Sequence, residues 1–168
     1  MFRSRVAVTA FALSGLCAGP VKTVTAGAAA GATAPVVPTL TQISAAHYPG
    51  FDRLVFQFSG PVPAQHSARY VSQASADPSG LPVNVAGSAT LLVRFSPATG
   101  HNAQGNVTYG AAQRTYALPG LVQVVKAGDF ESVLSFGVGV ARAAPVHIFT
   151  LTRPSRVVID VRTPYRTV

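Results

Sequence analysis

The chain has 168 residues, a length that fits one domain of ordinary size. Only 11% of its residues are charged and 48% are hydrophobic. This balance excludes intrinsic disorder over most of the length, because disordered chains combine low hydrophobicity with high charge. Thirteen Lys and Arg against five Asp and Glu give a net charge of +8. The single cysteine, Cys17, excludes a disulfide framework and a cysteine-based zinc site.

The first thirty residues have the pattern of a secretory signal peptide. Arg3 and Arg5 precede an uncharged, mostly apolar run over residues 6–19. The run is shorter than the roughly 20 apolar residues that a membrane-spanning helix needs. We therefore expect export to the periplasm, the cell wall or the medium, with no transmembrane span left after cleavage between about residues 26 and 34.

The rest of the chain is expected to divide into two parts. Residues 31–38 are rich in Ala and Pro and predict a flexible tether, and residues 39–168 predict the folded domain. A bulky Leu16 precedes Cys17 where a bacterial lipobox has a small residue, so no lipid anchor is expected. Basic residues are scattered through the folded part rather than gathered in a stripe, so no nucleic-acid partner is expected.

Alternating apolar residues predict β-strands. The pattern is clear in residues 54–58, 91–95, 134–140 and 157–161. Weaker candidates lie at residues 39–45, 69–73, 122–126 and 146–152. About eight or nine short strands separated by turn residues predict an all-β single domain, an antiparallel β-sandwich or a related barrel.

One face of each clear strand is expected to form the core. The eight residues expected there are Phe56, Phe58, Val93, Phe95, Phe136, Val138, Val157 and Ile159. On the opposite face of residues 134–140 stand Ser135, Gly137 and Gly139, whose small size would let another backbone approach closely.

Catalytic and metal-binding constellations are missing from the sequence. The five carboxylates include one close pair, Asp129 and Glu131, but Gly128 beside them indicates a solvated turn. No Gly-x-Ser-x-Gly elbow occurs in the folded part. The four histidines are never two or four residues apart, and His147 is expected to be a packed strand residue. We therefore expect no catalytic residues, no metal and no cofactor.

The long segment from Ser96 to Gly120 supplies the candidate ligand contacts. It carries few apolar residues, and a loop of this length in a compact domain is either functional or mobile. Its tyrosines offer flat amphipathic rings for a glycan, and its guanidinium can pair with carboxylate or phosphate. The candidate ligand-binding residues are His101, Tyr109, Arg114 and Tyr116.

Other charged residues are expected to form structural ion pairs. Asp52 lies beside Arg53, and Asp160 shares one face of the last predicted strand with Arg156 and Arg162. Such pairs fix cross-strand register at little cost, which favours a structural role over a catalytic one.

Three segments stand out in order along the chain: GFDRLVFQF at residues 50–58, AGDFESVLSFG at residues 127–137 and FTLTRPSRVVIDV at residues 149–161. Together they resemble the AMIN-like domain of exported actinobacterial proteins. The resemblance spans about Thr39 to Arg162. The last segment ends in a Pro-x-Arg-hydrophobic-hydrophobic-hydrophobic-Asp run. This run is similar to that of the AMIN domain, a β-rich module of bacterial amidases and secretion components. The resemblance implies an envelope-targeting or cell-wall-binding module without activity of its own.

Three functions are compatible with these observations. The first is a noncatalytic exported domain that binds peptidoglycan or another anionic wall polymer. The second is an envelope protein-interaction module that uses an exposed strand edge. The third is a small wall hydrolase.

Overall fold

A computed structural model describes residues 36–163 of the chain. The expected signal peptide, Cys17 and residues 31–35 of the expected tether lie outside the described residues. Within residues 36–163 there are eleven strands and no helix, so this part contains no helix that could cross a membrane.

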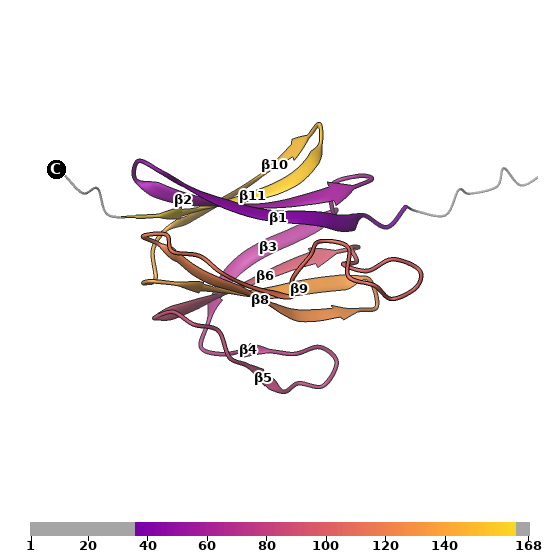
Figure 1. Ribbon diagram of the computed structural model, residues 1–168, viewed down its shortest axis with the longest axis horizontal. Coiled ribbons are helices and arrows are strands. Elements are labelled where there is room, and N and C mark those ends of the chain that lie inside the picture. Colours follow the sequence, from indigo (N-terminus) through magenta and orange to yellow (C-terminus); the bar gives the residue numbers. More distant parts are fainter. Residues whose placement is uncertain (1–35, 164–168) are drawn as a thin grey trace, which may run out of the picture. The chain divides into compact units, whose positions relative to one another are not determined.

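Two antiparallel sheets pack face to face (Figure 1). The first sheet has the order β1 (Thr39–Tyr48), β2 (Phe51–Ser59), β11 (Ser155–Arg162) and β10 (Val146–Thr152). The second sheet has the order β3 (Gln65–Val71), β6 (Ala89–Ser96), β9 (Val133–Val140), β8 (Leu121–Phe130) and β7 (Gln113–Thr115). A short hairpin, β4 (Ala74–Ser75) with β5 (Pro82–Val83), lies beyond the second sheet (Figure 1). The predicted antiparallel β-sandwich is confirmed.

The structure has more strands than the eight or nine predicted. Each of the eight segments predicted from the sequence overlaps one of the strands that are seven or more residues long. The three remaining strands, β4, β5 and β7, have only two or three residues. A period of two cannot be recognised over so short a length, which explains the difference.

The core lies between the two sheets. All eight predicted core residues are at most 3% exposed, so that prediction is confirmed. The ring of Phe56 on β2 lies 4.9 Å from that of Phe95 and 5.3 Å from that of Phe136, which joins the two sheets through aromatic contacts. Burying a side chain of this size contributes roughly 2–3 kcal/mol to the stability of the folded state.

Glycines on β9 let another segment lie directly on the outer face of the second sheet. A Cβ atom on Gly139 would lie 1.8 Å from the carbonyl oxygen of Ala86, and one on Gly137 would lie 2.6 Å from Cγ2 of Val85. The close backbone approach that the sequence predicts is therefore confirmed at Gly139, whereas Gly137 leaves room for the side chain of Val85.

Asp52 connects the two sheets from inside the sandwich. Its side chain is fully buried, and Oδ2 accepts hydrogen bonds from the backbone N–H groups of Gly120 at 2.5 Å and Leu121 at 2.8 Å. Its Oδ1 lies 2.6 Å from Nδ1 of His47 on β1. A Cβ on Gly120 would meet Cγ2 of Thr163 at 2.7 Å, so this contact requires glycine. The carboxylate thus fixes the beginning of β8 against β1 and β2.

Replacing Gly139 by Ala is expected to destabilise the domain by about 3 kcal/mol, because the new methyl group overlaps the backbone of Ala86. The control is Gly80→Ala, where no atom lies within 4 Å of the added Cβ and the φ of 69° is the only strain. That change is expected to cost about 1 kcal/mol. The free energy of unfolding in denaturant measures both, and equal costs would contradict the close packing.

Candidate functional site

The outer face of the first sheet gathers aromatic and charged side chains around Arg53. Alternation along β2 turns Arg53 away from the core, opposite to Asp52. The cross-strand register places Asp160 of β11 beside Arg53, and Phe51 of β2 beside Tyr48 of β1. We call Arg53, Asp160 and the rings of Tyr48, Phe51 and Phe149 the Arg53 cluster.

Arg53 holds this cluster together. Its Nε and Nη2 donate to the two carboxylate oxygens of Asp160, each at 2.8 Å. Its Cζ lies 5.2 Å from the ring centroids of Tyr48 and Phe51 and 5.3 Å from that of Phe149. The hydrogen bond to Asp160 raises the pKa of Arg53 above its usual value, against an opposing effect of burial. The guanidinium is thus committed to its neighbours and orients three rings.

A groove of about 530 Å³ adjoins the Arg53 cluster. Phe51 and Asp160 belong to both, and Pro49, Pro145, Val146, His147 and Arg162 complete the lining. Apolar walls with a few polar groups are typical of ligand sites. Arg162 is exposed and makes no ion pair with another residue of the described part, so its charge is available to a ligand.

His147 lies on this outer face, so the expectation of a packed strand residue was wrong. It is exposed, and its ring stacks on Phe149 at 5.3 Å. Val146 and Ile148 are the residues of β10 that pack against the core. The sequence alternates apolar character on both faces of β10, which is why the inward face was misidentified.

Of the residues expected to form ion pairs, Arg53 and Asp160 pair with each other, Asp52 contacts a histidine, and Arg156 and Arg162 have no acidic partner among the described residues. Arg53 pairs with Asp160, whereas Asp52 contacts His47 because it points to the opposite face from Arg53. Arg156 donates from Nε to the carbonyl oxygen of Pro154 at 3.4 Å. Within residues 36–163 neither Arg156 nor Arg162 has a carboxylate partner.

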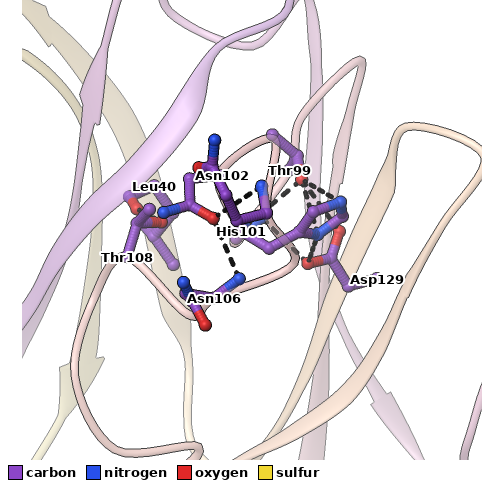
Figure 2. A network of polar contacts seen from close by, with 9 residues as sticks. Leu40, Thr99, His101, Asn102, Asn106, Thr108 and Asp129 are labelled. Carbon is purple, nitrogen blue, oxygen red and sulfur yellow. Dashed lines mark hydrogen bonds and ion pairs between the residues drawn. The ribbon is translucent and has the colours of Figure 1, made fainter.

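His101 belongs to a second polar network, which Figure 2 shows. Its Nδ1 lies 2.6 Å from Oδ2 of Asp129, a carboxylate that also accepts the N–H of Gly100 at 3.0 Å and the hydroxyl of Thr99 at 3.3 Å. The amide oxygen of Asn102 accepts two backbone N–H groups of the following turn. These bonds anchor the loop to the β8–β9 hairpin.

This network lacks the geometry of a catalytic relay. A relay places the nucleophile on one imidazole nitrogen and the carboxylate on the other. Here the closest contacts of Thr99 and Asp129 are both to Nδ1 of His101, at 2.9 and 2.6 Å. Glu131 lies in the turn after β8, with a φ of 48°. The part of the chain that the structure describes contains no cluster of three or more potential metal ligands.

Three of the four candidate ligand contacts are structural within the segment from Ser96 to Gly120. Tyr109 is only 2% exposed, and its ring packs on that of Phe136 at 5.5 Å. Arg114 donates to the carbonyl oxygens of Ile43 at 2.9 Å and Tyr109 at 2.8 Å. The hydroxyl of Tyr116 is buried. Only His101 of the four is exposed.

The fold and this surface define a β-sandwich module whose polar and aromatic groups are arranged on the outside of one sheet. A family model described as the AMIN-like domain matches residues 38–163. The chain therefore belongs to the AMIN-like domain family. No curated protein and no solved structure matches it.

Burial of Tyr109 predicts a loss of stability at alkaline pH. Burial raises the pKa of its hydroxyl to about 12, with Asp129 adding and Arg114 opposing. The unfolded chain has a tyrosine pKa of about 10. The contribution of this hydroxyl to the free energy of unfolding is therefore fully present below about pH 10, and it is lost as the pH rises toward 12. Tyr109→Phe is expected to shift the alkaline unfolding midpoint upward.

The same substitution removes a buried hydroxyl that has no hydrogen-bond partner among the described residues. At pH 7 the free energy of unfolding is therefore expected to stay unchanged or rise by up to about 1 kcal/mol. Tyr48→Phe is the control, because Tyr48 is exposed and its hydroxyl makes no hydrogen bond within residues 36–163. An unchanged alkaline midpoint for Tyr109→Phe would contradict the role of burial.

Proposed function

We propose that this protein is a noncatalytic cell-envelope domain that binds peptidoglycan or another anionic wall polymer through the Arg53 cluster and its groove. The observation that carries the proposal is the set of partly exposed rings held by Arg53 beside Arg162, a cation that has no ion-pair partner within residues 36–163. Membership in the AMIN-like domain family supports a peptidoglycan-associated role in the envelope. The signal-peptide pattern supports a place outside the cytoplasm.

The side chains of the site are suited to the two features of such a polymer, the apolar faces of its sugars and its anionic groups. Phe51 and Tyr48, stacked at 5.2 Å with an angle of 11° between their rings, offer flat surface to the apolar face of a sugar. The guanidinium of Arg162 suits a carboxylate or phosphate. Because Arg53 is already paired with Asp160, we assign it to positioning the rings rather than to binding an anion.

The chemistry of the groove favours binding over hydrolysis. A glycosidase typically needs two carboxyl groups that face each other across the scissile bond. Among the described residues that line this groove, Asp160 is the one carboxylate, and both of its oxygens accept from Arg53. The hydrolase alternative therefore finds no support at this surface.

Co-sedimentation with purified peptidoglycan sacculi tests the proposal. Combining Phe51→Ala with Arg162→Ala in the full chain is expected to weaken binding at least about tenfold, or ~1.4 kcal/mol. Binding by the unchanged protein is also expected to fall as salt rises through physiological strength, because exposed charges are then screened beyond about 8 Å.

The matched control is Arg69→Ala, which removes an exposed arginine from β3 of the second sheet. It lowers the net charge by one, as Arg162→Ala does, and is expected to retain most of the binding. Equal loss in the control would indicate nonspecific attraction, and full binding by the double variant would exclude this surface.

A further inference from the structure

A cleft of about 810 Å³ lies beside the β4–β5 hairpin, on the second sheet. Among the residues that the structure describes, the lining contains no charged residue and no aromatic residue. Side-chain amides and hydroxyls dominate its polar groups, which include Gln73, Asn84, Ser88, Thr90, Gln113 and Gln123. The cleft therefore differs in chemistry from the groove beside Arg53.

The segment from Asn84 to Ser88 forms a fixed wall of this cleft. Ala86 rests on Gly139, and its N–H donates to Oε1 of Gln123 at 2.8 Å. Gln123 is only 7% exposed, and its Nε2 also donates to Oγ1 of Thr115 at 3.3 Å. The N–H of Ser88 donates to the carbonyl oxygen of Val140 at 2.9 Å. The wall is thus formed before any ligand arrives, which lowers the entropic cost of binding.

Several polar groups of the lining remain free. The backbone groups of Asn84, Val85 and Gly87 make no hydrogen bond to another residue within the described range 36–163, and neither do the side-chain amides of Asn84 and Gln113. Together they offer both N–H donors and carbonyl acceptors. This is the same set of groups that a peptide backbone presents, so each can pair with an extended peptide.

The lining is less suited to the other common ligands. Because its described residues include no cation, the lining does not neutralise phosphate or carboxylate, and because they include no aromatic ring, it offers no stacking surface to a sugar or a base. Val83 and Val85 add small apolar contacts at alternate positions. Extended peptides present their side chains with the same alternation.

The outer edge of β1 does not offer the same opportunity. The N–H of Leu40 donates to the carbonyl oxygen of Thr99, and the carbonyl oxygens of Leu40 and Ile43 accept from Thr108 and Arg114. Side chains and loop backbone therefore already occupy groups that an added strand would need.

We propose that the cleft beside the β4–β5 hairpin docks an extended, uncharged peptide segment of a partner protein. The bound segment pairs its backbone with the free groups of Asn84, Val85, Gly87 and Gln113. This site lies on a different sheet from the Arg53 cluster and does not depend on polymer binding.

An array of short, capped peptides that lack charged residues tests the proposal with the full-length chain. Some of these peptides are expected to bind, and in the ¹⁵N spectrum of the protein they should shift the resonances of residues 84–88 and Gln113. The variant Gln113→Glu places an unpaired charge in the cleft. It is expected to weaken the binding of these peptides at least about tenfold.

The matched control is Gln104→Glu, which makes the same change at an exposed residue outside the cleft lining and should leave binding intact. Three outcomes would overturn the proposal: no peptide of the array binds, bound peptides shift resonances elsewhere, or both variants bind equally. Shifts of the cleft resonances by neutral chitohexaose, in the absence of peptide binding, would assign the cleft to a glycan instead.

Discussion

The buried carboxylate of Asp52 is the constraint on which the arrangement of the two sheets depends. It is fully buried yet accepts two backbone N–H groups at the beginning of β8, and it also contacts His47. Buried charges are costly unless they are satisfied in this way. Because Gly120 leaves room for the carboxylate, β8 can begin directly against the first sheet.

Arg53, the residue after Asp52, organises the outer surface of the first sheet. Alternation along β2 turns Arg53 outward, where the register that β2 shares with β11 brings it to Asp160. The rings of Tyr48, Phe51 and Phe149 then collect around one guanidinium. Two adjacent charged residues therefore serve different ends, one holding the sandwich together and the other organising the surface that we assign to wall binding.

Sequence periodicity was sufficient for the eight longer strands and the core, because a half-buried strand shows its inward face locally, as Phe56 and Phe58 do. It could not identify the Arg53 cluster, since Arg53 and Asp160 lie 107 residues apart and meet only through strand pairing. The polar composition of residues 96–120 suggested Tyr109 as a ligand contact, whereas its ring is buried and anchors this segment to the core. His147 shows the same limit, because β10 carries apolar residues on both faces.

The most direct measurement is a map of backbone amide resonances of the ¹⁵N-labelled full chain during titration with solubilised peptidoglycan fragments. We expect the shifts to concentrate on Phe51, Arg53, His147 and Asp160, with saturation at a common affinity. Shifts confined to the loop around His101, or the absence of shifts at concentrations where intact sacculi retain the protein, would contradict wall binding through the Arg53 cluster and its groove.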